Sequence, residues 1–261
     1  MNEIIAKSWT DLQELLFEDA LDPRLNRFRS QYAFRGHQHA NYNLATSLAR
    51  LGGDFAGMER HIFRNFKKYA HQDVVERDSE WHWLSVAKHH GLPTRLIDWS
   101  YSPFVAMHFA VENIINFGID GAIWCVHFAK AHAMLPQSFK KLLYKEGADM
   151  FAVDMLTDAQ VTLHDLDRLS PDPYVVFFEP PSIDARIVNQ YALFSVMSDP
   201  VLLMDDWLNA HPQIWRKIII PASLKWEVRD KLDQANISER VLFPGLDGLS
   251  KFLKRQYSIR E

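Results

Sequence analysis

The densest group of chemically active side chains in the sequence lies between residues 89 and 100. Imidazole, guanidinium, carboxylate, indole and hydroxyl groups occur there, in His89, His90, Arg95, Asp98, Trp99 and Ser100. A guanidinium binds carboxylates and phosphates through paired hydrogen bonds, and an indole ring can stack on a planar ligand. We therefore predict that this run lines a ligand pocket, in which Arg95 holds an anionic group, Trp99 stacks, and His90 or Asp98 fixes the loop.

Two helices should hold this run in place. The first has a serine cap and ends at a glycine, and the second begins at Ser102, which is followed by a proline at the first helical position. Pro93 requires the residue before it to be extended, so we expect a short strand over residues 94–99. The alternation of a strand puts Arg95 and Asp98 on opposite faces, and they need not pair with each other.

A second candidate is Arg35, on a predicted strand over residues 31–37. Gly36 follows it and would let the backbone bend or approach a ligand closely. From this position the Arg35 guanidinium could grip a carboxylate or a phosphate, whereas the structural alternative is a salt bridge within the protein.

A third candidate is the pair Asn189 and Gln190, which interrupts an otherwise apolar stretch predicted as a strand over residues 186–196. Burying either amide without a partner would cost about 1–3 kcal/mol. Both side chains must therefore be satisfied, by protein or by ligand.

Length and composition limit the class of protein. A chain of 261 residues with 48% hydrophobic content can bury a large core, and we expect a single domain over residues 1–261. A net charge of -4 gives no global basic field that would attract nucleic acid or an anionic membrane. The single cysteine, Cys125, excludes an internal disulfide. The sequence begins without a secretory pattern and has no apolar run near the roughly 18 residues of a membrane span, so we expect a cytoplasmic protein with no membrane partner.

The order of the predicted elements indicates an α+β fold. Helices without regular strand–helix alternation surround the expected strands, which favours a mixed or antiparallel sheet core. We expect residues 130–170 to cover the sheet, where they could form a lid. The strands are predicted over residues 31–37, 94–99, 121–128, 174–178, 186–196 and 216–220, with an N-terminal helix over 8–20 and a C-terminal helix over 250–257.

Four motifs follow one another along the chain. They are Phe34-Arg35-Gly36, the run from His89 to Trp99 with Ser102-Pro103 and Phe109-Ala110, the Arg186-Ile187-Val188-Asn189-Gln190 segment with Phe194, and Leu242-Phe243-Pro244-Gly245-Leu246. In this order they resemble the bacterial FRG domain family, named for its aromatic-Arg-Gly motif. The resemblance covers about residues 30–250. This chain has His37 where the family more often has Gln, and it has Tyr191 or Ala192 where a glycine is expected after Gln190.

The chain also resembles ADP-ribosyltransferases of the Arg-Ser-Glu type, which implies an ADP-ribosyltransferase-like fold and NAD as a substrate. By that resemblance Arg35 holds NAD phosphate, and the strand ending at Ser100 leads into a helix rich in Ala and Phe. The third motif has Asn189 or Gln190 in place of a glutamate, and Glu179 lies upstream. The resemblance thus implies a pocket with Arg35, Asp98 and Gln190 as catalytic residues, and Arg35, His89, His90, Arg95, Trp99, Ser100 and Asn189 as ligand-binding residues.

Two other functions remain open. A nucleic-acid or nucleotide binding module without catalysis would use the arginines of the pocket and a basic helix that carries Arg60, Arg64, Lys67 and Lys68. A protein-interaction domain would use the motifs as core polar networks. We expect no metal: His37, His39, His89, His90 and Asp98 supply ligand types, but no His-Glu-x-x-His or cysteine pair supports a site.

Overall fold

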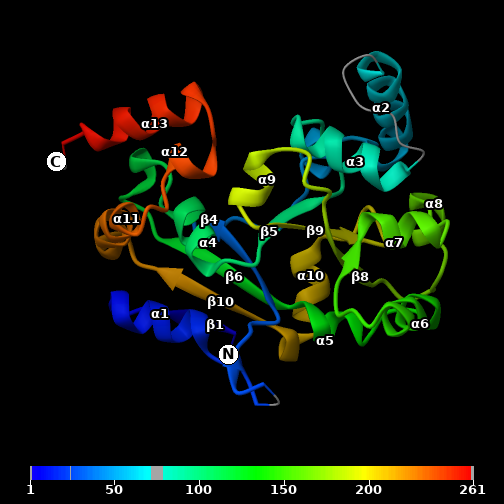
Figure 1. Cartoon of the computed structure of the whole chain (residues 1–261), viewed down its shortest axis with the longest axis horizontal. Helices are drawn as coiled ribbons and strands as arrows, with labels where there is room; N and C mark the ends of the chain where they lie inside the picture. Colours follow the sequence, from blue (N-terminus) through cyan, green and yellow to red (C-terminus); the bar gives the residue numbers. More distant parts are fainter. Residues whose placement is uncertain (1, 24, 72–78, 260–261) are drawn as a thin grey trace.

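An eight-stranded mixed sheet forms the centre of the molecule in the computed structural model, which describes residues 2–23, 25–71 and 79–259 (Figure 1). The strand order is β1-β10-β6-β4-β5-β9-β8-β7. The outer pairs β1/β10 and β7/β8 are parallel, and the pairs between them are antiparallel. The strands are β1 (Glu3–Ile5), β4 (Tyr32–His37), β5 (Ile97–Ser100), β6 (Gly121–His127), β7 (Phe151–Ala152), β8 (Val175–Glu179), β9 (Ala192–Met197) and β10 (Trp215–Ile220), with a separate hairpin of β2 (Leu21–Asp22) and β3 (Arg27–Phe28). The predicted α+β class is confirmed.

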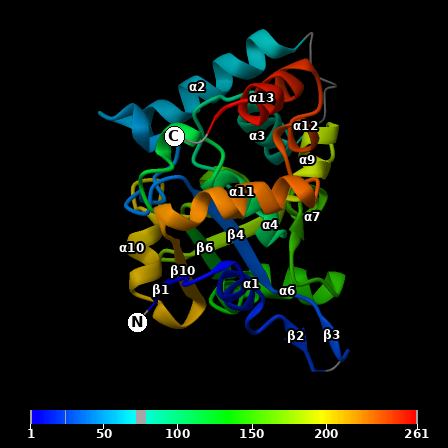
Figure 2. The same ribbon diagram turned by 90° about the vertical axis from the view of Figure 1, so that its left-hand side faces the viewer.

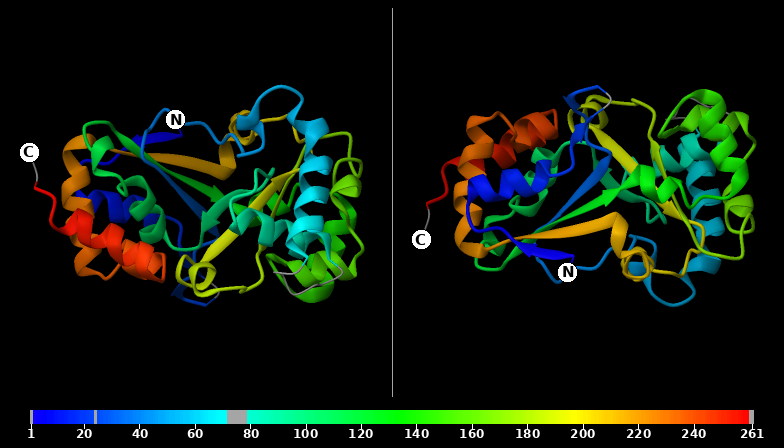
Figure 3. Two further views of the ribbon diagram at one scale, coloured as in Figure 1. Left: turned by 90° about the horizontal axis from the view of Figure 1, so that it is seen from above. Right: turned by 90° about the horizontal axis from the view of Figure 1, so that it is seen from below.

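Helices cover both faces and both ends of this sheet. Figure 2 shows α11 and α1 in front of the strands, and Figure 3 shows α11 and α13 at one end of the molecule with α2 and α6 at the other. None of the helices in the described part of the chain combines the length and apolar character that crossing a lipid bilayer requires. The helices are α1 (Trp9–Phe17), α2 (Phe55–Ala70), α3 (Glu80–His89), α4 (Pro103–Ala110), α5 (Phe128–His132), α6 (Gln137–Glu146), α7 (Val153–Asp158), α8 (Leu163–Leu166), α9 (Ala185–Asn189), α10 (Met204–Asn209), α11 (Lys225–Gln234), α12 (Glu239–Leu242) and α13 (Leu246–Gln256), with 3-10 turns at Ala49–Leu51, Ile114–Asn116, Pro212–Ile214 and Ala222–Leu224.

Four elements differ from the sequence prediction. The strand predicted over 94–99 begins only at Ile97, and the strand predicted over 186–196 is a short helix, α9, followed by β9. The helix replaces a strand because the Asp184 side chain accepts a hydrogen bond from the Ile187 amide and caps the turn. The predicted terminal helices are shifted: α1 ends at Phe17, and α13 begins at Leu246.

Alternation along the strands divides the core into three apolar clusters. One cluster lies on one face of the sheet, and we call it the rear cluster and the other face the front face. The opposite face carries two clusters, one beside α4 and one beside α3. The rear cluster contains Ile97, Trp99, Trp124, Phe177 and Trp207; the α4-side cluster contains Phe34, Met107, Ile123, Ile218 and Val228; the α3-side cluster contains Trp81, Leu84, Phe139, Phe178 and Phe194.

The two clusters of the front face, one beside α3 and one beside α4, are separated where β4 and β5 diverge. β4 pairs with β6 over its whole length, Tyr32 to His37, but pairs with β5 only at Phe34 and Ser100. Beyond that pair, Nη1 of Arg35 donates a hydrogen bond to the main-chain oxygen of Asp98 at 2.7 Å. The Arg35 side chain thus binds the Asp98 carbonyl group, which a neighbouring strand would otherwise bind. Beyond the Phe34–Ser100 pair β4 and β5 diverge, and we call this point of separation the seam.

Gly36 lies at the same seam because helix α4 packs directly on β4. A Cβ atom at residue 36 would lie 1.8 Å from the carbonyl oxygen of Ala106 and 2.7 Å from the amide nitrogen of Ala110. The glycine therefore allows a close approach of the α4 backbone, and through it the placement of the residues that follow α4.

Candidate functional site

A cavity of about 690 Å³ opens at the seam between β4 and β5. The ends of α3 and α4 and the helix α9 supply its other walls. Its basic residues are Arg35, Arg50, Lys88 and Arg186, its acidic residues are Asp98 and Glu112, and aromatic surface comes from Phe34, Tyr42, Phe109 and Phe194. A polar cavity with an excess of basic over acidic side chains and aromatic walls fits an anionic ligand that carries a planar ring.

Arg35 is held in position by His37. Nε of Arg35 donates to Nε2 of His37 at 3.0 Å, and the Nδ1 atom of His37 lies 3.3 Å from the main-chain oxygen of Tyr42. Burial, helped by the Arg35 charge, lowers the pKa of His37 to about 3. The imidazole is therefore neutral, with its proton on Nδ1, and its Nε2 acts as an acceptor.

Asp98 is the fixed negative charge of the cavity. Lys88 Nζ lies 2.7 Å and Arg35 Nη1 lies 3.8 Å from its Oδ2 atom. Withdrawal from bulk water raises the pKa of Asp98, but the charges of Lys88 and Arg35 outweigh this effect and hold the pKa below its usual value. Asp98 thus remains ionised at neutral pH, and its side chain is 54% exposed.

The C-terminal hairpin of α12 and α13 packs against the end of α9, which lines the cavity. Asn189 donates to the main-chain oxygen of Val241 at 2.7 Å, and Gln190 donates to that of Leu242 at 2.9 Å. The two amides are thus satisfied largely by protein, and of the two only Gln190 lines the cavity. Ser100 contributes its hydroxyl to the same region by donating to the main-chain oxygen of Gln190 at 2.7 Å.

Arg186 connects this hairpin with the cavity. Its guanidinium carbon lies 5.0 Å from the centre of the Phe243 ring, in a cation–π arrangement. Its charge favours the ionised forms of Asp98 and Glu112, although burial still raises the pKa of Glu112 above its usual value.

His89 joins α3 to α9. Its Nε2 atom lies 2.7 Å from Oδ2 of Asp184, the residue that caps α9. Burial lowers the pKa of His89 more than the Asp184 carboxylate raises it. Figure 1 shows α9 between α3 and α12, which is the position from which it can wall the site.

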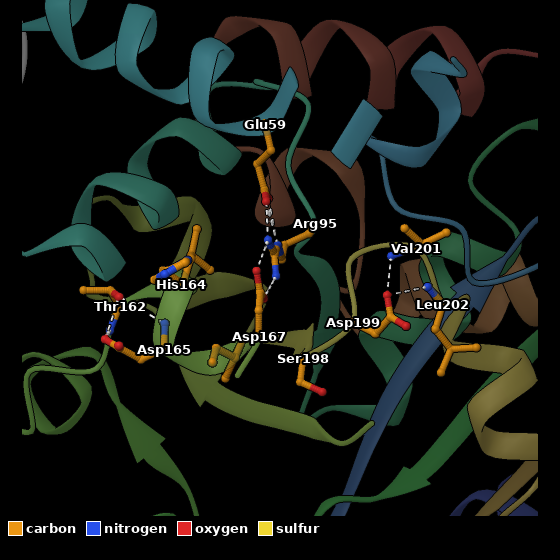
Figure 4. Close-up of polar contacts among 12 residues, drawn as sticks. Glu59, Arg95, Thr162, His164, Asp165, Asp167, Ser198, Asp199, Val201 and Leu202 are labelled. Atoms are coloured by element: carbon orange, nitrogen blue, oxygen red, sulfur yellow. Dashed lines mark hydrogen bonds and ion pairs between the residues drawn. The ribbon is translucent and has the colours of Figure 1, made fainter. Parts of the chain in front are cut away.

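Arg95 lies outside this cavity, contrary to the sequence prediction. Arg95 is 5% exposed, and its guanidinium makes an ion triad with the buried Glu59 of α2 and the part-buried Asp167, which follows α8 (Figure 4). Nε of Arg95 lies 2.9 and 2.8 Å from the two carboxylate oxygens of Glu59, and Nη1 lies 2.5 Å from Oδ1 of Asp167. Arg95 thus links α2 to the segment after α8, and it lines a second cavity beside α2 instead of the cavity at the seam.

Two other predicted residues also differ from expectation. The Trp99 ring belongs to the rear cluster, where Nε1 donates to Ser195 Oγ at 2.8 Å and the ring packs edge-on against Phe177. Trp99 borders the cavity but does not offer its ring for stacking. His90 is exposed at the end of α3 and is absent from the cavity wall. The structure therefore brings together Arg35, His89, Asp98, Ser100 and Gln190, and not His90, Arg95 or Asn189.

The sequence analysis missed several wall residues. Lys88 directly precedes the histidine pair on the last turn of α3, and Arg186 and Phe109 lie inside quoted motifs, so each had a local signal. Tyr42, Arg50 and Glu112 stand in no motif, and only the fold reveals them. None of residues 130–170 lines the cavity, so the segment does not act as a lid over it in this structure.

Within the described ranges, no group of three or more His, Cys, Asp or Glu side chains is arranged to hold a metal ion. His37, one of the residues considered for that role, is instead bound to Arg35 and Tyr42.

Comparison with known proteins agrees with the motif at this seam. Residues 30–117 match the model of the FRG domain, a segment that runs from β4 through α4 and supplies Arg35, Lys88, Asp98 and Glu112 to the cavity. The match is shorter than the predicted range of residues 30–250. Arg186 and the α12–α13 hairpin lie beyond the matched segment. No curated protein and no solved structure matches the chain. The chain therefore contains an FRG domain, at residues 30–117.

Proposed function

We propose that the cavity binds NAD or a related nucleotide. The observation that carries this proposal is the fixed guanidinium of Arg35 at the point where β4 and β5 separate. Its Nε and Nη1 atoms are used for orientation, and Nη2 makes no hydrogen bond to another described residue, so it can donate to a ligand phosphate.

The rest of the wall supports a ligand with both phosphate and ring. Arg50, Lys88 and Arg186 add positive charge, and the half-exposed Tyr42 ring at the wall can stack on a base. A volume of about 690 Å³ falls in the range of about 300–1,000 Å³ that is usual for small-molecule and cofactor sites.

Transfer of ADP-ribose is the reaction that we propose for a bound NAD. Gln190, at the position of the missing glutamate, donates its amide to a main-chain oxygen and carries no negative charge. Any catalytic negative charge must therefore come from another part of the cavity, where Asp98 and Glu112 are the carboxyl groups of the wall.

Isothermal titration with NAD, ADP-ribose and a short single-stranded RNA tests the proposal. We expect micromolar binding of NAD or ADP-ribose to the wild type and a loss of at least tenfold in Arg35→Ala. Arg64→Ala removes an exposed arginine of α2 outside the cavity and should leave the affinity unchanged. Equal affinity in the wild type and in Arg35→Ala would refute the site, and no binding of either nucleotide would refute the proposed function.

A second candidate function, nucleic-acid binding, is favoured by one observation. A separate cavity of about 720 Å³ lies beside α2, and Arg60, Arg64 and Lys67 line it together with Arg95 and the carboxyl groups of Glu59, Glu80 and Asp167. These charges could follow a phosphate backbone. Binding of the RNA alone, weakened by salt and abolished in an Arg60→Ala/Arg64→Ala/Lys67→Ala variant, would support this function over the first.

A further inference from the structure

Two carboxyl groups face the cavity in opposite electrostatic surroundings. Asp98 is paired with Lys88 and lies near Arg35, and it is held ionised. Glu112, just beyond the last turn of α4, makes no hydrogen bond to another described side chain, and burial raises its pKa in spite of the charges of Lys251 and Arg186. Pairs of carboxyl groups that the protein separates in this way commonly divide the roles of fixed charge and proton carrier.

Arg186 lines the same cavity as the two carboxyl groups. Its positive charge favours the ionised form of each and so acts to lower the pKa of both. A ligand that occupies this space therefore meets a fixed anion, a less acidic carboxyl and a cation at once.

We infer that Glu112 is the general base of a transfer reaction at the ribose carbon C1′ of NAD, and that Asp98 is the fixed carboxylate beside that carbon. This inference rests on the proposed function, and it assigns the negative charge that the third motif lacks to two residues of the FRG domain itself.

The reaction balances without any oxidant or reductant. The bond between C1′ and the pyridinium nitrogen of NAD breaks, and both electrons pass to the ring, which leaves as neutral nicotinamide. The Asp98 carboxylate stabilises the positive charge that develops on the ribose. An acceptor hydroxyl, water in the simplest case, forms the new bond to C1′ and gives its proton to the Glu112 carboxylate, which then releases it to solvent.

The other candidate for the base is less suited. The Oδ2 atom of Asp98 already lies 2.7 Å from Lys88 Nζ. The lowered pKa of Asp98 also makes its carboxylate a weak proton acceptor. Glu112 has neither restriction, and a raised pKa brings a carboxylate closer to the pH at which it works as a base.

Glu112→Gln separates binding from proton transfer. We expect this variant to bind NAD as tightly as the wild type, by isothermal titration, while nicotinamide release, followed by chromatography, falls by about 10²-fold or more. The wild-type rate should rise with pH through an inflection above 4.5, the ordinary Glu value, and Glu112→Gln should lose this inflection. Glu14→Gln, an exposed carboxyl on α1, is the matched control and should behave as the wild type.

The outcomes separate the two proposals. If the wild type binds NAD but releases no nicotinamide, or if Glu112→Gln releases it at the wild-type rate with the same pH profile, the inference is wrong and the nucleotide site stands. If the wild type does not bind NAD, the proposed function fails and this inference fails with it.

Discussion

Arg35 and His37, two residues apart on β4, form one unit: Nε of the arginine donates to Nε2 of the imidazole at 3.0 Å, so the ring must stay neutral for the guanidinium to hold its direction. The histidine thus sets the geometry of the cation while its Nδ1 atom faces the main-chain oxygen of Tyr42. In this chain the residue that follows the Phe34-Arg35-Gly36 motif therefore fixes the direction of the Arg35 guanidinium.

This unit predicts opposite effects for two substitutions of His37. His37→Gln supplies an amide oxygen that can accept from Arg35, and we expect NAD affinity to stay within about threefold. His37→Leu removes the acceptor, which costs about 1 kcal/mol in a typical hydrogen bond and should weaken NAD binding about fivefold. Titration calorimetry on both variants decides the point, and equal affinities would show that His37 does not position Arg35.

Gly36 should tolerate no side chain. A Cβ atom there would overlap the carbonyl of Ala106, so Gly36→Ala must push α4 away from β4 and should lower the free energy of unfolding by about 1–3 kcal/mol or more. Gly118→Ala is the control, because a Cβ at residue 118 meets no atom within 4 Å. Urea denaturation measures both variants, and equal stabilities would contradict the packing argument.

The Arg95 triad predicts a large effect on stability without an effect on the ligand. Arg95→Met leaves the carboxylates of Glu59 and Asp167 without their shared cation, and breaking a buried pair typically costs about 3–5 kcal/mol. Because Arg95 is not part of the cavity wall, the folded variant should bind NAD within twofold of the wild type. Denaturation and titration on the same sample test both halves, and a weakened NAD affinity would return Arg95 to the site.

His132 predicts a specific acid sensitivity. Its Nε2 accepts from the Phe177 amide at 3.0 Å, and burial lowers its pKa from 6.5 to about 4. Between pH 6.5 and 4 the unfolded chain binds a proton that the folded chain does not, so the free energy of unfolding should fall by about 1.4 kcal/mol per pH unit from this group as the pH falls. His132→Gln keeps an acceptor but cannot titrate, and its stability curve should be less steep by that amount. An unchanged slope would refute a neutral, buried His132.

Phe243 should matter to the ligand through Arg186. Phe243→Ala removes the ring beneath the guanidinium, a contact worth about 0.5–1 kcal/mol, and should weaken NAD binding about two- to fivefold. Phe252→Ala removes another ring from the same hairpin, one that contacts Arg240 and Arg255, and serves as the control. Equal losses in both variants would indicate a general loosening of the hairpin.

Much of the sheet could be predicted because its central strands are apolar runs between turn signals. The strand predicted over 121–128 is β6, Gly121–His127, and the one over 216–220 is β10, Trp215–Ile220. The prediction of one strand over residues 186–196 was wrong for a local reason that the apolar pattern does not show. The Asp184 side chain caps a short helix, α9. Tyr191 then adopts φ 48°, a conformation that favours glycine, and the chain turns there into β9. That is where the family resemblance expects a glycine.

The site was predicted only as far as its motifs reach. Arg35, Asp98 and Gln190 line one cavity, because the segments that carry the three motifs lie side by side in the fold. Arg95 could not be excluded from sequence, since its partners lie 36 and 72 residues away and nothing local marks them. Glu112 was missed because the close packing of α4 on β4, rather than any motif, carries it to the wall.

The two faces of the sheet differ in how their apolar clusters connect across the seam between β4 and β5. On the rear face one continuous apolar cluster joins both halves of the sheet, whereas on the front face the α3-side and α4-side clusters stand apart with the cavity between them. Arg35 of β4 and Lys88 of α3 stand on the two sides of this opening. An anion bound to both, as we propose for the site, would therefore link the two halves of the front face, which the strands themselves do not join beyond Phe34 and Ser100.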